Sequence, residues 1–281
     1  MKLSTKSKIA IASIISRFFR TTRSMLGFKN KTQFKRDEII WDLDLAQGID
    51  FAIFLQGGFE PETIKTYRKY VTLGSVVLDI GANVGAHTLP LAKMVGETGK
   101  VIAFEPTDYA YEKLTRNIEL NPDLKLMITA VQVMLVGGRQ EIRPESIPSS
   151  WSLEQNHSTN KHPVHLGEYQ SLEQAQLARL DDWCVENRLD RLDFVKIDVD
   201  GYEIDVLKGA ENTLNKYSPK IMMEFMPYIF KERGHSFQQL LDLLKGHGYN
   251  CQIIDGPSVE LNVSILKYIP SGGSINVILS K

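Results

Sequence analysis

Apolar and polar positions are arranged differently in the two parts of this 281-residue chain, which meet near residue 75. In the first part, residues 38–60 alternate apolar with polar side chains and hold three glycines, a pattern that predicts one or two short strands joined by turns. Pro61 then begins a predicted helix, because its fixed φ and missing N–H do no harm in a first helical turn.

Beyond residue 75, short apolar runs alternate with amphipathic segments. This alternation predicts an α/β fold, in which helices cover both faces of a mostly parallel sheet and a ligand binds at the carboxyl ends of the strands. The predicted strands are 76–78, 101–104, one within 126–136, 194–197, 220–225, 251–254 and 275–279. The predicted helices are 89–95, 108–120, 204–214 and 237–244.

Residues 137–175 interrupt this alternation with a polar segment that contains three prolines and His157, His162 and His165. So long a segment within a compact domain predicts a functional insertion or a poorly ordered loop. The histidines have no fixed helical spacing, and we interpret them as solvated side chains rather than as metal ligands. The stretch 149–152 offers hydroxyls and an indole face that suit a sugar or planar acceptor.

The charge is divided unevenly along the chain. Residues 1–36 carry ten Lys or Arg and no acidic residue, which leaves 23 basic and 34 acidic side chains in residues 37–281. An acidic body argues against sequence-independent binding of nucleic acid, because that binding depends on neutralising phosphates. We therefore expect a basic N-terminal extension over 1–36, a folded domain over 37–281 and no nucleic-acid partner.

The extension admits three interpretations. It fits a solvated tail, a basic amphipathic helix in peripheral contact with an anionic membrane, or a mitochondrial presequence if the source is eukaryotic. The sequence has no apolar run of about 18 residues, so we expect no membrane-spanning helix. Its two cysteines, Cys184 and Cys251, form no CxxC pair, which favours a reducing compartment such as the cytoplasm.

A glycine loop follows the first strand of the alternating region, in the pattern Asp79-x-Gly81-x-x-x-Gly85. The two glycines permit a tight turn and a close approach of the backbone to a ligand where the next helix begins. Asp79 places a carboxylate at the strand end, where it suits an ammonium group of a ligand and argues against a dinucleotide pyrophosphate. Glu105, at the end of the second strand, is placed to accept hydrogen bonds from ribose hydroxyls.

A second group of acids is predicted where the fourth and fifth strands end. Asp198 is the strongest candidate for a functional carboxylate, and Lys196 alternates to the same face, where it offsets the charge of Asp198. Glu203 is interpreted as a charge that the helix dipole favours. Glu224 lies within an apolar strand, so it must be paired or exposed at the strand end near Asp198.

Two questions of chemistry stay open at this point. Asp198, Asp200 and Glu224 could hold a divalent cation such as Mg²⁺, or they could bind substrate hydroxyls. A general base for an alcohol nucleophile would be Asp198 or His235. His87, just after the glycine loop, is placed to contact substrate or cofactor.

These motifs resemble the FkbM family of methyltransferases over about residues 57–280. The matching stretches include 79–85, Glu105-Pro106, 180–182, 196–201 and 223–225. The resemblance implies a class I (Rossmann-like) methyltransferase fold, with a mostly parallel seven-stranded sheet and an antiparallel edge strand. It also implies methyl transfer from S-adenosylmethionine to a hydroxyl of a small-molecule acceptor such as a sugar, a glycan or a secondary metabolite. The residues that it places on the cofactor are Asp79, Gly81, Asn83, Gly85 and Glu105.

The sequence departs from the family pattern at two places. Asp200 stands where the family usually has Glu, and residues 130–134 hold no acid where the family often has one near the adenine. We therefore expect Gln132 or backbone groups to contact the adenine. Two alternatives remain: a nicotinamide-dependent oxidoreductase, and a non-catalytic protein that keeps the fold.

Overall fold

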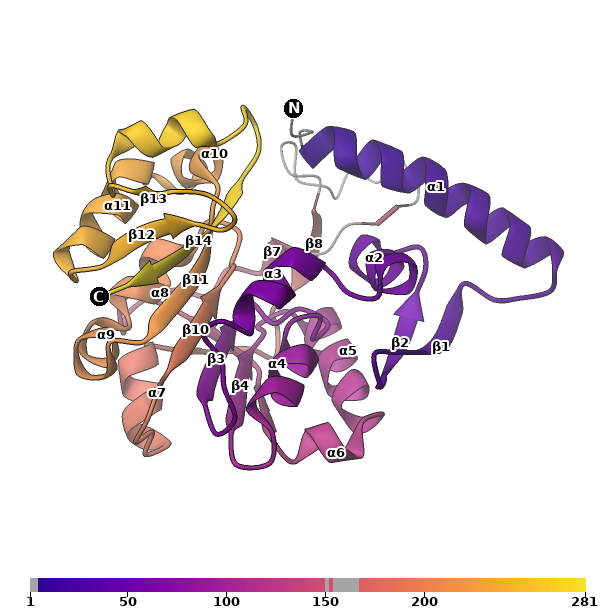
Figure 1. Ribbon diagram of the computed structural model, residues 1–281, viewed down its shortest axis with the longest axis horizontal. Helices are drawn as coiled ribbons and strands as arrows, with labels where there is room; N and C mark the ends of the chain where they lie inside the picture. The colour runs from indigo at the N-terminus through magenta and orange to yellow at the C-terminus, as the bar shows by residue number, and fades with distance from the viewer. Residues whose placement is uncertain (1–4, 150–151, 154–166) are drawn as a thin grey trace.

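An eight-stranded sheet forms the centre of the molecule, in a computed structural model that describes residues 5–149, 152–153 and 167–281. Its five parallel strands lie side by side, and the antiparallel β14 is inserted between β11 and β12 (Figure 1). The strand order is β13 (Ser258–Val259), β12 (Asn250–Ile253), β14 (Ile275–Ser280), β11 (Lys220–Phe225), β10 (Phe194–Ile197), β3 (Val76–Ile80), β4 (Lys100–Phe104) and β5 (Ile128–Val131).

This topology confirms the predicted fold class. All seven predicted strands belong to the sheet, and the two-residue β13 adds an antiparallel edge. The central strands form because their apolar runs are buried on both faces, as Leu78 and Val77 of β3 show by being fully buried. His157, His162, His165, Ser150 and Trp151 lie outside the described residues.

Helices cover both faces of the sheet, as predicted. On one face α3 (Pro61–Tyr67), α4 (Thr88–Val95) and α5 (Asp108–Glu119) pack against side chains such as Val77 and Val101. On the other face α7 (Leu180–Glu186), α8 (Glu203–Lys208), α9 (Glu211–Tyr217) and α11 (Phe237–Gly246) pack against Leu78 and its neighbours. The helix predicted over 204–214 is divided into α8 and α9 at Gly209, where a Cβ would lie 2.2 Å from the carbonyl oxygen of Val136.

Short elements complete the two helical layers and the inserted segment. These are α6 (Pro122–Lys125), α10 (Pro227–Phe230), the 3₁₀ helices η1 (Lys231–Arg233) and η2 (Val263–Tyr268), and strands β6 (Val133–Leu135), β7 (Ser146–Ser149), β8 (Glu168–Ser171) and β9 (Gln176–Ala178). Within the segment 137–175, β7 and β8 pair as antiparallel strands. Among the described helices, none is both long and apolar enough to cross a membrane.

The N-terminal part contains α1 (Thr5–Met25), β1 (Lys31–Arg36), β2 (Ile39–Asp44) and α2 (Gly48–Gln56). The prediction of strands over 38–60 is correct for β2 and wrong for α2. Ile49, Phe51 and Ile53 of α2 are all buried, because neighbouring elements cover the helix on several sides. A helix buried in this way has no one-sided periodicity, and its apolar residues alternate by chance.

Candidate active site

A cavity of about 590 Å³ lies at the carboxyl ends of the central strands. It belongs to the size class of small-molecule sites, which span about 300–1,000 Å³. Its walls include residues that follow β3, β4 and β10, namely Gly81, Glu105 and Asp198, together with Glu224 of β11. These side chains meet because the parallel register pairs Ile80 with both Phe104 and Ile197, so the strands end at the same level.

The glycine loop, residues 81–85, admits no side chain at either glycine. Gly81 has a φ of +80°, and a Cβ there would lie 1.9 Å from the backbone oxygen of Asp198. Gly85 has a φ of +90°, and its Cβ would lie 2.7 Å from Cδ1 of Leu89. Both glycines therefore allow the loop to pass close to β10 and to α4. Gly81, Ala82 and Asn83 line the cavity, whereas Gly85 packs against Leu89 and does not line it, so its predicted contact with the cofactor is not supported.

Asp79 lies beneath the glycine loop rather than on the cavity. Its side chain is completely buried, and Oδ2 accepts a hydrogen bond of 2.6 Å from Thr88 Oγ1. The structure thus differs from the predicted direct pairing with an ammonium group of a ligand. Asp79 instead connects the end of β3 to the start of α4, and so fixes the loop between them.

Lys196 of β10 connects the glycine loop to Asp79 of β3 and to Asp198, which follows β10. Nζ donates a hydrogen bond of 2.7 Å to the carbonyl oxygen of Gly81, and lies 3.5 Å from both Asp79 Oδ1 and Asp198 Oδ2. Burial disfavours its charge, but the carboxylates of Asp198, Asp79 and Glu60 outweigh burial and raise the pKa of Lys196. The predicted offset of the Asp198 charge by Lys196 is confirmed.

Glu105 is a buried carboxylate in the wall of the cavity. Oε1 accepts hydrogen bonds from the backbone N–H and the hydroxyl of Thr107, and Oε2 accepts one of 2.9 Å from the N–H of Asn83. Burial raises the pKa of Glu105 against the effect of these bonds. Because Oε2 has one protein donor, it retains a lone pair for a hydroxyl group of a ligand.

Asn83 connects the glycine loop to the inserted segment. It has a φ of +48°, and its Oδ1 accepts a hydrogen bond from the N–H of Val84. Its Nδ2 donates a hydrogen bond of 3.1 Å to Ser149 Oγ of β7. Pro148 and Ser149 also line the cavity, so the segment 137–175 contributes to the site.

Gln132 does not line the cavity, and its predicted contact with adenine is not supported. Its Nε2 donates a hydrogen bond of 2.7 Å to Asp108 Oδ1, because the chain leaves the sheet between β5 and β6 and the side chain faces α5. Asp108 also accepts bonds from Ser171 and Glu173, so Gln132 helps to hold the segment that follows β8. The side chains beside the cavity at this position are Val133, Met134 and Leu135 of β6.

Four acids form a carboxylate cluster at the other end of the cavity: Glu60, Asp198, Asp200 and Glu224. Burial and the neighbouring charges of Asp198 and Glu203 raise the pKa of Asp200 to about 8. Burial, Asp198 and Glu60 also raise the pKa of Glu224 well above its ordinary value, although Ser274 Oγ donates a hydrogen bond to it. Asp200 therefore holds its proton at neutral pH.

Glu60 was given no chemical role by the sequence. It precedes α3 with a φ of +50°, and its Oε2 accepts hydrogen bonds from Thr63 Oγ1 and Asn276 Nδ2. Burial and the charge of Asp198 raise the pKa of Glu60. The sequence signal for Glu60 is its place in the stretch 59–62, which also resembles the FkbM family. That signal does not reveal its closeness to Asp198, which depends on where β14 and α3 lie in the fold.

The described residues include no group of three metal-ligating side chains placed to hold an ion. The predicted metal site of Asp198, Asp200 and Glu224 is therefore not supported. Ser274 already donates a hydrogen bond to Glu224, and Lys196 supplies a positive charge beside Asp198.

The two candidate histidines occupy different places. His235 does not line the cavity, and its Nε2 lies 3.9 Å from Asp205 of α8, which removes His235 from the candidate bases. His235 follows η1, and the sequence spacing could not show that η1 directs this side chain away from the cavity. His87 does line the cavity, where Nδ1 shares a 3.0 Å hydrogen bond with the Tyr67 hydroxyl. Burial and the charge of Lys196 lower the pKa of His87 well below its ordinary value, so the ring is neutral.

Glu203 supports the carboxylate cluster from α8. Its Oε1 accepts long hydrogen bonds from the N–H groups of Val199 and Gly201, on either side of Asp200. Burial raises the pKa of Glu203 to about 7, although these N–H groups oppose the change. Its role is thus more than the predicted charge in the first helical turn, because it shapes the loop that carries Asp200.

The sheet order, the glycine loop and a carboxylate that faces the cavity after β4 define a class I S-adenosylmethionine-dependent methyltransferase. The chain belongs to the FkbM methyltransferase family, because the family model described as "Methyltransferase FkbM domain" matches residues 79–251. The family and the enzyme class predicted from the motifs are thereby confirmed. The nicotinamide-dependent and non-catalytic alternatives are not favoured.

Curated relatives agree with this assignment. The chain is 28% identical over 204 residues to 2-O-methyltransferase NoeI of Sinorhizobium fredii, covering 68% of this chain and 82% of NoeI. It is 25% identical over 158 residues to hexuronic acid methyltransferase AglP of Haloferax volcanii, covering 55% of this chain and 58% of AglP. A solved FkbM methyltransferase of Methylobacillus flagellatus is 15% identical, with 77% and 50% coverage and a TM-score of 0.43.

Proposed function

We propose that this methyltransferase transfers a methyl group from S-adenosylmethionine to a hydroxyl oxygen of a sugar or glycan. The observation that carries the proposal is the position of Asp198, in the same cavity as the glycine loop and 3.5 Å from Lys196, which is itself bonded to Gly81. The printed names of NoeI and AglP, a 2-O-methyltransferase and a hexuronic acid methyltransferase, support the choice of a sugar hydroxyl.

The residues present fit the cofactor. Gly81, Ala82 and Asn83 of the glycine loop line the cavity, and Gly81 can pass this close to Asp198 only because it has no Cβ. Glu105 presents a buried carboxylate with a free lone pair to the same cavity. Val133 and Met134 offer apolar surface for a planar base. When bound, S-adenosylmethionine supplies an electrophilic methyl group on a positively charged sulfur. The chain then has to align an acceptor oxygen with that methyl group and remove a proton.

Asp198 is the group that accepts this proton. Its side chain is about one-third exposed at 33%, while Asp79 and Lys196 beside it are fully buried, so it is the member of this trio that an acceptor can reach. Asp200, whose pKa is raised to about 8, carries its proton at neutral pH. It is therefore suited to donate a hydrogen bond to another oxygen of a polyol, as neutral carboxyl groups do in other enzyme sites. Glu224, whose pKa burial also raises, lies beside it on the cavity.

Activation of the hydroxyl by a bound cation is the weaker alternative. We infer that the carboxylate cluster does this work without a metal, because Lys196 already pairs with Asp198 and the described residues include no group of three ligands placed to hold an ion. Turnover should then persist after dialysis against a chelator. Loss of turnover that Mg²⁺ restores would instead return the cation to the mechanism.

The test is a methyl-transfer assay with labelled S-adenosylmethionine and a panel of soluble glycosides and hexuronic acids. Asp198→Asn should lower turnover by roughly 10²- to 10⁴-fold, the usual contribution of a general base. Its affinity for S-adenosylhomocysteine, measured by calorimetry, should stay close to that of the wild type. Asp190→Asn, at an exposed acid away from the cavity, is the matched control and should change neither value. Full turnover in Asp198→Asn would refute the assignment.

A further inference from the structure

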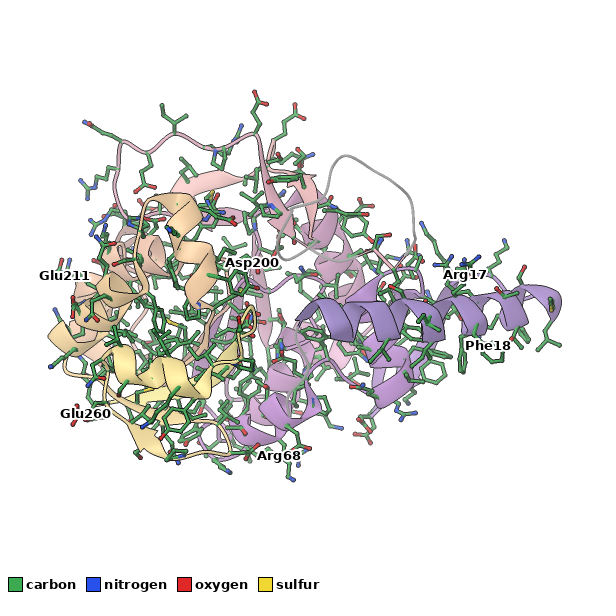
Figure 2. All side chains as sticks on the ribbon, turned by 90° about the horizontal axis from the view of Figure 1, so that it is seen from above. Arg17, Phe18, Arg68, Asp200, Glu211 and Glu260 are labelled. Atoms are coloured by element: carbon green, nitrogen blue, oxygen red, sulfur yellow. The ribbon has the colours of Figure 1, made fainter. Side chains whose placement is uncertain are left out.

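The helix α1 exposes a continuous apolar stripe that no other described element covers. Ile14, Phe18 and Met25 are 69%, 71% and 82% exposed, and their spacing of four and seven residues places them on one side of the helix. The opposite side packs on the body, where Ser16 Oγ donates to the carbonyl oxygen of Leu45 and Phe19 meets Phe51 edge to face. Figure 2 shows Phe18 and Arg17 on a part of α1 that extends beyond the rest of the molecule.

The N-terminal part that contains α1 differs in charge from the rest of the protein. The ten basic and no acidic residues of 1–36 contrast with the 23 basic and 34 acidic residues that follow. An anionic lipid surface attracts the first and repels the second, which orients the molecule with α1 towards the lipid. A second copy of the chain fits the stripe less well, because stripe-to-stripe contact would bring two strongly cationic helices together.

The same helix forms part of the cavity wall. Ile11, Ala12 and Ile15 line the cavity together with Ala52 and Leu55 of α2. The cavity thus runs from the glycine loop and the carboxylate cluster to an apolar region between α1 and α2. A polar sugar alone would make no favourable contact with that apolar region, whereas an acceptor with a hydrocarbon part would fill it.

We propose that α1 seats the protein on an anionic lipid surface with the cavity opening beside it, and that the acceptor hydroxyl belongs to an amphiphile with a sugar headgroup. The docking rests on α1 alone, while the class of acceptor rests on the function proposed above. Apolar side chains at 14, 18 and 25 enter the acyl boundary, and the basic residues of the extension bind the anionic headgroups.

Docking is tested by co-sedimentation with two kinds of vesicle: phosphatidylcholine alone, and phosphatidylcholine with phosphatidylglycerol. The wild type should bind the anionic vesicles preferentially, with an affinity that falls as salt rises. The double variant Ile14→Ser/Phe18→Ser should bind at least about tenfold more weakly, since it removes two apolar side chains that would otherwise be buried in the lipid. Leu126→Ser, at a leucine 86% exposed on the body, is the matched control and should bind like the wild type.

Two results would overturn the docking: equal binding to both kinds of vesicle, and undiminished vesicle binding by the double variant. If the second result came with a dimer in light scattering that the double variant dissolves, the stripe would instead bind a second copy of the chain. Neither Ile14 nor Phe18 lines the cavity, so S-adenosylhomocysteine should bind all variants alike and report that each is folded. This measurement and the soluble-glycoside assay address the proposed function separately from the docking.

The acceptor class is tested with dodecyl maltoside, below its micellar concentration, against maltose. The alkyl glycoside should bind the protein saturated with S-adenosylhomocysteine at least about tenfold more tightly, by burial of its hydrocarbon chain. Ala52→Asp should remove that difference, because it places a charge in the apolar region of the cavity. Equal affinities of the wild type for the two sugars would overturn the amphiphilic acceptor.

Discussion

The amine of Lys196 donates a hydrogen bond to the carbonyl oxygen of Gly81 over 2.7 Å. This bond links the loop that cradles the cofactor to the strand that carries Asp198. One buried cation therefore lies within 3.5 Å of two acids, Asp79 and Asp198, and also donates a hydrogen bond to a loop carbonyl. Four separate consequences of this arrangement and of its neighbours can be measured.

Replacing Lys196 by Met should destabilise the protein strongly. The variant leaves Asp79 buried beside no cation, and the loss of one partner of a buried pair typically costs about 3–5 kcal/mol. Urea unfolding measures this free energy. Lys245→Met, at an exposed lysine of α11, should change it by less than about 0.5 kcal/mol. A loss in Lys196→Met as small as in the control would contradict the role of the cation.

Replacing Gly81 by Ala should greatly weaken cofactor binding while the protein still folds. The new Cβ would lie 1.9 Å from the Asp198 oxygen and requires a φ of +80°, so the loop must move away from β10. A displacement of this size should weaken S-adenosylhomocysteine binding by roughly 100-fold or more. Gly246→Ala, where nothing lies within 4 Å, is the control and should bind normally in calorimetry.

Glu105→Gln should weaken cofactor binding without removing the fold. The amide preserves the shape of the side chain but loses the charge, and hydrogen bonds to a charged group contribute about 1.5–3 kcal/mol, or about 10- to 100-fold in affinity. Calorimetry with S-adenosylhomocysteine measures the change. Glu97→Gln, at an exposed acid after α4, should leave the affinity as it is. Equal affinities of the two variants would show that Glu105 makes no contact with the ribose.

The raised pKa of Glu203 should make the stability of the protein depend on pH. Its pKa rises from 4.5 to about 7 on folding, mainly through burial. A raised pKa contributes stability that is complete below the unfolded value and is lost as the pH rises through the folded value. The free energy of unfolding of the wild type, relative to Glu203→Gln, should therefore fall between about pH 4.5 and about pH 7.

Urea unfolding of both proteins across this range of pH provides the measurement. Glu211→Gln makes a strict control, because Glu211 occupies the first turn of α9 as Glu203 occupies the first turn of α8, yet is exposed. Its curve should run parallel to that of the wild type. A parallel curve for Glu203→Gln would mean that the carboxyl group does not hold its proton more tightly in the folded state.

The central sheet could be predicted because its strands are apolar on both faces. Runs such as 76–78 and 194–197 differ from amphipathic helices in length and in periodicity, and glycine or acid ends each one. The helix α2 could not be predicted in this way, since its neighbours bury it on several sides. Because the cavity lies where the strands end, predicting the strand ends also placed Asp198 and Glu224 correctly on the cavity.

The errors within the site arise where the chain leaves the sheet. Gln132 follows the last residue of β5, and the direction of its side chain depends on the turn into β6. His235 follows a 3₁₀ helix whose direction no periodicity encodes. Glu60 lies 138 positions before Asp198 in the sequence, and only tertiary packing against β14 brings it into the cluster. Asp79 was placed at the correct strand end but faces the inside of the protein.

The close approach of Gly81 to the Asp198 backbone also has an evolutionary meaning. A lineage that lost the glycine would have to displace β10, and the acid that it carries, in the same step. We therefore expect the glycine loop and Asp198 to be inherited together. The parts of the cavity wall that lie outside this contact, which are α1, α2 and the segment around β7, are free of that constraint. New acceptors should arise through those three segments, while the chemistry stays as it was.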